Sequence, residues 1–197
     1  MKEYEITLTL TEELLGTVPK DPEVYARHIA NRAALDDEQL AEELNTVAEM
    51  EEKGWTGFHM LDGKPILYNY VIKGFFKDAC GMLRRASGTK SAALPAYKKV
   101  IDGLLFIFPR QIPVHPNGQM GVNERPLRAS TAQGERIALA RSDTCPPGST
   151  ITFQLHVMGV VTDVLLREWL DYGELRGLGQ WRNAGYGSFT YELENLS

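Results

Sequence analysis

The last third of the chain carries two strand patterns on either side of a helix pattern, and this order limits the folds that it can adopt. Residues 151–158 alternate apolar and polar side chains, and so do residues 189–193. A period of two is typical of a strand with one buried face. Between them, TDVLLREWLDYG predicts an amphipathic helix that is capped by Thr162 or Asp163 and ends at Gly173. The order strand, helix, strand predicts helices packed on a sheet.

The rest of the chain extends this pattern into one α+β domain over residues 1–197. A strand is expected at 2–10, helices at 22–34, 38–53 and 69–86, and strands at 99–109 and 135–141. The expected fold is a ferredoxin-like (RRM-like) antiparallel sheet with helices on one face, plus inserted helical and hairpin segments. A segment rich in Pro, Gly and Asn makes 109–130 the candidate for an extended arm.

Composition excludes several classes of protein. No apolar run approaches the ~20 residues that cross a bilayer, and the acidic, alternating N-terminus does not resemble a signal peptide. Two cysteines are too few for a disulfide framework, which favours a cytoplasmic protein. The P-loop, the GxSxG elbow, the HExxH motif and metal-ligand spacings do not occur, so neither a metal nor another cofactor is expected.

Charge is distributed unevenly along the chain. Residues 1–62 hold five basic and 15 acidic side chains, residues 63–150 hold 13 and 5, and residues 151–197 hold 3 and 6. The net charge is −5, yet one face of the protein is expected to be basic. A segregated but solvated surface explains the same counts.

A glycine-rich loop, GLGQWRNAGYGSF, occupies residues 177–189 between the predicted helix and the last strand. Its backbone amides could form a phosphate site, its arginine could contact a phosphate, and its aromatic and amide side chains could contact bases. A tight structural turn is the alternative. The candidate nucleic-acid-binding residues of the loop are Gly177, Gly179, Gln180, Trp181, Arg182, Asn183, Gly185, Tyr186 and Gly187.

The pattern G-x-G-x(5)-G-x-G-x-F before a last strand resembles the signature of the RAMP superfamily, the repeat-associated proteins of CRISPR effector complexes. ILYNYVIKGFF and Pro147-Gly148-Ser149 resemble further segments of the family's RNA-binding backbone subunits, although YNYV replaces the usual small residues before Lys73. KGFFKDACGML is also similar to phage or prophage proteins. The resemblance implies an RRM-like fold, binding of a guide RNA, and a "thumb" hairpin in the role of the 109–130 arm.

Cations elsewhere suggest where a nucleic-acid backbone would run. Lys73, Lys77 and Arg84 share one face of the predicted 69–86 helix, and Arg125 and Arg128 lie within the expected 109–130 arm. A solvated helix face and ordinary loop polarity are the alternatives for these two groups.

A catalytic alternative centres on the first predicted helix. Tyr25 and His28 lie on one helical face, and the resemblance implies that some guide-RNA-processing relatives use a histidine and a tyrosine in this region. Such a pair could cleave RNA without a metal. An interfacial histidine with no catalytic role explains the pattern as well.

The sequence thus favours a protein that binds single-stranded RNA or DNA, with RNA preferred, and that forms a homo-oligomer or joins a larger complex along the strand. Alternatives are a metal-independent endoribonuclease and a phage-encoded protein-interaction subunit that keeps the fold. No membrane partner is expected, and the expected location is the cytoplasm of a bacterium or of a phage-infected host.

Overall fold

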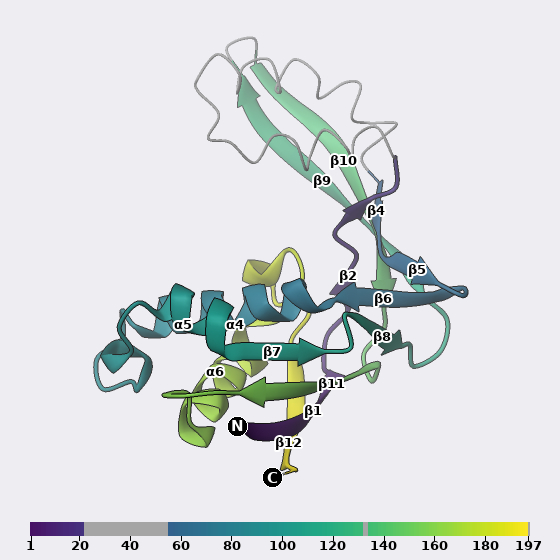
Figure 1. Cartoon of the computed structure of the whole chain (residues 1–197). Helices are drawn as coiled ribbons and strands as arrows, with labels where there is room; N and C mark the ends of the chain where they lie inside the picture. The colour runs from purple at the N-terminus through teal and green to yellow at the C-terminus, as the bar shows by residue number, and fades with distance from the viewer. Residues whose placement is uncertain (22–54, 132–133, 197) are drawn as a thin grey trace.

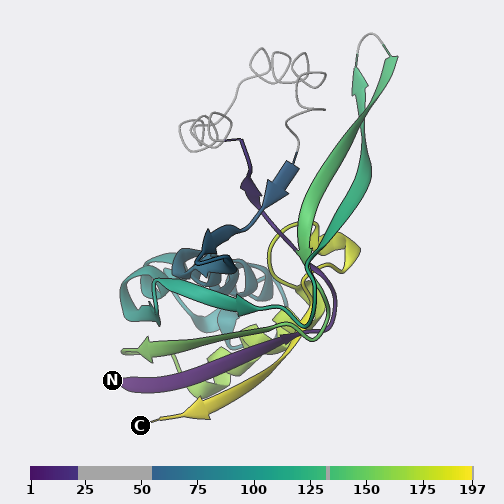
Figure 2. The ribbon, with the colours of Figure 1, turned by 90° about the vertical axis from the view of Figure 1, so that its right-hand side faces the viewer.

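The computed structural model describes residues 1–21, 55–131 and 134–196. Six of its elements form the central unit: β1 (Lys2–Leu10), α4 (Asn69–Leu83), β7 (Leu105–Phe108), β11 (Thr150–Val157), α6 (Asp163–Arg176) and β12 (Phe189–Asn195). Their strands pair antiparallel in the order β12-β1-β11-β7, and α4 and α6 cover one face (Figures 1 and 2). This is the split βαβ arrangement of the ferredoxin-like fold. The predicted α+β class is confirmed.

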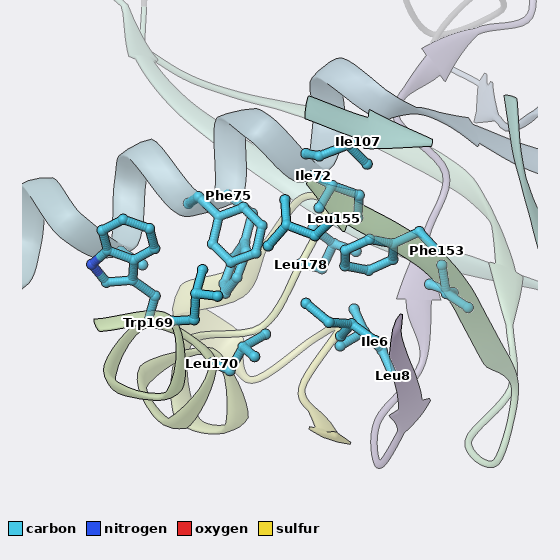
Figure 3. Packing of buried hydrophobic residues seen from close by; sticks show 14 of the residues in the cluster. Ile6, Leu8, Ile72, Phe75, Ile107, Phe153, Leu155, Trp169, Leu170 and Leu178 are labelled. Carbon is cyan, nitrogen blue, oxygen red and sulfur yellow. The ribbon is translucent and has the colours of Figure 1, made fainter. Parts of the chain in front are cut away.

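The core of the protein lies between this sheet and the two helices. Alternate residues of β1, such as Ile6 and Leu8, are buried, and so are Phe153 and Leu155 of β11. Figure 3 shows them packed against Ile72 and Phe75 of α4 and against Trp169 and Leu170 of α6. The alternation in the sequence therefore directs one face of each strand toward the helices.

Further strands extend the central sheet beyond β11. The sheet continues through β8 (Gln111–His115), β6 (Lys64–Tyr68) and β5 (His59–Leu61). A connecting segment holds the one-turn η1 (Ser91–Ala93) and α5 (Tyr97–Leu104), and η2 (Arg182–Ala184) lies within the glycine loop.

A long two-stranded hairpin leaves the body of the molecule (Figures 1 and 2). It consists of β9 (Gly121–Thr131) and β10 (Gly134–Cys145), paired antiparallel from Gly121–Thr144 to Thr131–Gly134. At its base β10 also pairs with β2 (Leu14–Leu15) and β4 (Trp55–Gly57), and β4 pairs with β3 (Val18–Pro19). The extended arm expected at 109–130 therefore lies further along the chain, because residues 111–115 join the central sheet as β8.

Two boundaries differ from the sequence-based expectation. Residues 99–104 belong to α5 and only 105–108 form a strand, since Val100, Ile101 and Leu104 follow a helical spacing. Helix α6 does not end at Gly173 but continues to Arg176. A Cβ atom at Gly173 would lie 2.4 Å from the Phe189 ring and 2.6 Å from the Phe75 ring, so this glycine permits close packing instead of ending the helix.

The other expected elements agree with the structure where residues are described. The predicted helix at 69–86 is α4, the predicted strand at 135–141 lies within β10, and Thr162 caps α6 by accepting a hydrogen bond from the Leu165 amide. The helices expected at 22–34 and 38–53 lie outside the described residues.

Candidate nucleic-acid interface

The glycines of the 177–189 loop let its two arms touch. The Leu178 amide donates to the Gly187 carbonyl over 2.9 Å, and both Gly177 and Gly187 have positive φ. A Cβ atom at Gly187 would lie 2.0 Å from the Leu178 carbonyl oxygen, and one at Gly177 would lie 2.4 Å from that of Tyr186. Only glycine allows such an approach in this backbone conformation.

Several loop amides are used within the protein. Gly177 donates to the carbonyl of Gly173, Gly185 to that of Arg182, and Gly187 to that of Glu13. These three amides are not available to a phosphate in this conformation.

The side chain of Gln180 joins the loop to the base of the hairpin. Its Nε2 donates to the Gly16 carbonyl at 2.6 Å, Ser142 Oγ at 2.9 Å and Thr56 Oγ1 at 3.0 Å. Its Oε1 accepts from Nη2 of Arg125 at 3.4 Å. This amide thus connects the glycine loop with the β2–β3 link, β4, β10 and β9.

Trp181 lies beside this junction and combines exposure with backbone strain. Its side chain is 40% exposed, and its φ of 56° is in the left-handed region. Its ring stacks on Tyr186 with centroids 5.5 Å apart and planes 11° apart, and the Arg125 guanidinium carbon lies 4.3 Å from the Trp181 ring centroid. Asn123 Nδ2 donates to the Tyr186 hydroxyl at 3.0 Å. The loop and strand β9 together hold this stack of two aromatic rings and one guanidinium group.

Two buried polar atoms next to this surface have no hydrogen-bond partner among the described residues. They are Nε of Arg125 and Oδ1 of Asn123, one a donor and the other an acceptor. Burial lowers the pKa of the Arg125 guanidinium, and the nearby Tyr186 opposes that change. A buried cation with an unused donor is costly without a further partner.

Arg182 and Asn183, two other predicted contacts of the loop, are paired with side chains of the protein. Arg182 Nη1 donates to Asp78 of α4 at 2.7 Å, and Arg176 lies 3.7 Å from the same carboxylate. Asn183 accepts a hydrogen bond from Arg176. The positive charge of Arg182 is therefore balanced by a carboxylate of the protein.

Lys73, Lys77 and Arg84 share one face of α4, as predicted, but that face meets α5 and the segment before it. Lys73 donates to the Asp102 carbonyl at 2.9 Å, and Lys77 forms an ion pair of 2.5 Å with the Asp102 carboxylate. Arg84 donates to the Leu94 carbonyl and lies over the Tyr97 ring. The structure does not bring these three residues to the glycine loop.

The other predicted site residues fall in different places. Arg125 joins the glycine loop, whereas Arg128 is exposed and lies three positions further along β9, on the opposite face of the hairpin. Tyr25 and His28 lie outside the described residues. Within the described ranges no group of three His, Cys, Asp or Glu side chains could hold a metal, and no helix is long and apolar enough to span a membrane.

The sequence missed Asn123 and the partners of Gln180 at this junction. Asn123 lies 63 residues from Tyr186, and Thr56 lies 124 residues from Gln180. No local spacing could have paired them. The only signal in the sequence was the glycine loop itself.

Comparisons with known proteins establish the fold. No family model matches the chain, and no curated protein is similar to it in sequence. A chain of the Type III-B Cmr-beta complex bound to cognate target RNA, seen by cryo-EM, is 12% identical with a TM-score of 0.61. That match covers 98% of this chain and 60% of the length of the Cmr-beta chain. A chain of a Type IV-B CRISPR complex is 10% identical with a TM-score of 0.48, over 98% of this chain and 90% of that one.

Proposed function

We propose that this protein binds single-stranded nucleic acid, RNA in preference to DNA, at the junction of the glycine loop and the β9–β10 hairpin. The observation that carries the proposal is Trp181, an exposed aromatic side chain on a strained backbone, supported by Tyr186 and Arg125. Such strain persists only where the surroundings fix it, and strained residues cluster at binding sites.

A stacked aromatic surface fits single strands better than duplexes. Every base has a π-face that can stack on a tryptophan, but in a duplex that face is already covered by its neighbours. Arg125 Nε and Asn123 Oδ1 add a buried donor and a buried acceptor beside the ring. Once the junction opens and exposes these atoms, a base edge or a ribose 2′-hydroxyl can satisfy both, and the 2′-hydroxyl would give the preference for RNA.

The fold supports a place in a larger assembly on the strand. The similar Cmr-beta chain comes from a complex bound to target RNA. We propose that copies of the present chain, or this chain with other subunits, line up along a bound strand.

The proposal is tested by measuring fluorescence anisotropy of a labelled single-stranded RNA of mixed sequence. Loss of one base–aromatic contact weakens binding by roughly 5- to 150-fold, so Trp181→Ala should raise Kd by that factor. Trp181→Phe, which keeps a ring, should have a smaller effect. Leu175→Ala, an 82% exposed position on α6, is the matched control and should bind as the wild type does.

Two outcomes would contradict the proposal. Equal Kd values for the Trp181→Ala variant and the wild type would remove the loop junction as the binding site. Equal affinity for DNA and RNA strands of one sequence would remove the preference for RNA.

A separate measurement tests the assembly. Protein purified at low salt is passed over a size-exclusion column before and after nuclease treatment, and the absorbance ratio at 260 and 280 nm is recorded. Co-purifying RNA whose removal reduces the particle size is the expected result. A protein peak that is free of RNA and does not shift with added single strands would contradict the assembly.

A further inference from the structure

The face of the central sheet opposite the helices is acidic. Glu3 and Glu5 of β1 and Glu192 and Glu194 of β12 occupy the alternate positions that point away from the core. Glu5 lies directly opposite Glu194 in the β1–β12 ladder. Like charges at opposed positions destabilise a sheet. The outward positions of β12, β1, β11 and β7, all within the described residues, include no Lys or Arg. The Lys73 ammonium of α4 reaches the edge of this face, 5.8 Å from the ring centroid of Phe106.

Two large aromatic side chains lie on the same face, which we call the outer sheet face. Phe106 and Phe108 of β7 are 40% and 47% exposed, and the Phe108 ring lies 5.0 Å from that of His156 on β11. Aromatic side chains are enriched at protein interfaces, and the rim around them is polar. The four carboxylates repel phosphates, so a polyanion is disfavoured on this face and a basic protein surface is favoured.

A basic surface of that kind lies between α4 and α5 of the same chain. Residues 84–99, which we call the basic segment, contain five Lys or Arg and no Asp or Glu. Arg85, Lys90, Lys98 and Lys99 are exposed, and their side chains form no ion pair among the described residues. One carboxylate, that of Glu168 on α6, is bound to the segment through the backbone amides of Lys90 and Ser91. Figure 1 shows this segment at the end of the body away from the hairpin.

The basic segment also has an apolar centre that could receive the aromatic rings. Ala92, Ala93, Pro95 and Ala96 are exposed and lie between the cations in sequence. Small side chains leave room for bulky ones from a partner. The two surfaces therefore match in charge and in the size of their apolar groups.

We propose that the outer sheet face of one copy binds the basic segment of a second copy. This inference names the contact for the assembly in the proposed function and rests on that part of it. The two surfaces differ, so each bound copy leaves one of each kind free, and such head-to-tail contacts build open chains. Neither surface contains Trp181 or Arg125, so these residues stay available for a nucleic acid.

The test uses sedimentation velocity on nuclease-treated protein over a range of concentrations. At about 50 mM salt the sedimentation coefficient should rise with protein concentration, and at about 500 mM it should return to that of a monomer, because exposed charges are screened. A wild type that stays monomeric at low salt would overturn the proposal.

Charge reversal identifies the two surfaces. E5K/E194K makes the sheet face basic at those positions, and K98E/K99E makes the basic segment acidic there; each variant alone should remain monomeric. An equimolar mixture should assemble again in alternating order, because each surface then meets one of opposite charge. Circular dichroism checks that both variants fold. E174K and K64E, reversals at exposed positions outside both surfaces, are the controls and should assemble as the wild type does.

The possible failures of this proposal and of RNA binding are distinguishable. Assembly of either variant alone, or a mixture that stays monomeric, would overturn the interface even if both variants still bind RNA through Trp181. A K98E/K99E variant that loses RNA affinity while E5K/E194K keeps assembling would assign the basic segment to nucleic acid and overturn the contact between copies.

Discussion

The side-chain amide of Gln180 forms hydrogen bonds with four different residues. Its two hydrogens are shared among three acceptors, and its oxygen accepts from Arg125. Those partners come from four separate parts of the chain. The orientation of the hairpin relative to the glycine loop therefore depends on this residue, and with it the distance between Arg125 and Trp181.

Replacing Gln180 by Ala should lower the free energy of unfolding by about 1–3 kcal/mol, because buried partners lose their hydrogen bonds. Urea denaturation followed by circular dichroism measures the change. Gln154→Ala is the control, since Gln154 is exposed on the outer sheet face and should stay within about 0.5 kcal/mol of the wild type. If both variants lost the same free energy of unfolding, the Gln180 hydrogen bonds would contribute no more to stability than an exposed glutamine does.

Substitutions at two glycines of the loop distinguish the cost of a positive φ from the cost of a steric clash. Gly185 and Gly187 both have positive φ, at 90° and 74°, but a Cβ atom at Gly185 meets nothing within 4 Å. Gly185→Ala should cost about 1 kcal/mol of stability for its conformation. Gly187→Ala should cost clearly more, since its Cβ meets the Leu178 carbonyl. Thermal unfolding of both variants measures the two losses of stability. Equal losses, or a larger loss for Gly185→Ala, would contradict this interpretation of the loop.

Among the elements, α4 has different partners on two of its faces. Asp78 meets Arg182 of the glycine loop, while Lys73 and Lys77 meet Asp102 of α5. The Arg182–Asp78 side chains are a quarter to a third exposed, so their ion pair contributes less than about 1 kcal/mol to stability. Its main effect is to hold the Arg182 charge against the protein.

Asp78→Asn should release Arg182 and increase affinity for single-stranded RNA several-fold, with little loss of stability. Asp102→Asn is the matched control, since it frees Lys77 on the α5 side of the helix, and it should leave affinity close to that of the wild type. RNA titrations at one fixed salt concentration make the comparison. An equal increase in both variants would mean that net charge, and not the position of Arg182, controls binding.

At the scale of the whole molecule, both thiols report on unfolding. Cys80 and Cys145 are fully buried. Burial raises the pKa of both thiols, that of Cys145 to about 12. At pH 8 only roughly one Cys145 thiol in 10,000 would be the reactive thiolate.

The native protein should therefore react very slowly with a thiol reagent at pH 8, and both cysteines should react at once in guanidinium chloride. The raised pKa means that native reactivity increases as the pH approaches 12. The absorbance of the coloured thiolate that the reagent releases measures the rate of reaction and the number of cysteines that have reacted. Rapid labelling of one thiol in the native state would contradict the burial seen in the core.

Binding of RNA by the whole molecule should depend on salt. If a bound strand neutralises its phosphates at three contacts, the logarithm of affinity falls by about 2 for each decade of salt, given a slope of about 0.7 per contact on single strands. Affinity should then drop roughly 20-fold between about 50 and 200 mM salt. A Kd that does not change over this range would contradict phosphate contacts at the interface.

Much of the fold could be read from short-range pattern. The alternation in β1, β11 and β12 placed their buried faces, and the helical spacing of α4 and α6 predicted two helices for one side of the sheet. The position of the glycine loop followed from the same order. These features depend on a few neighbouring residues, so the sequence alone determined them.

The site depended on contacts that sequence spacing does not encode. Only the tertiary structure showed that Gln180 meets Gly16, 164 residues away, and that Asp78 neutralises Arg182 across 104 residues. The partner of a charged or amide side chain depends on which elements meet in space, and no periodicity records that meeting. The sequence thus determined a ferredoxin-like sheet with a glycine loop, whereas tertiary packing decided that Trp181, Tyr186 and the buried Arg125 lie against one another.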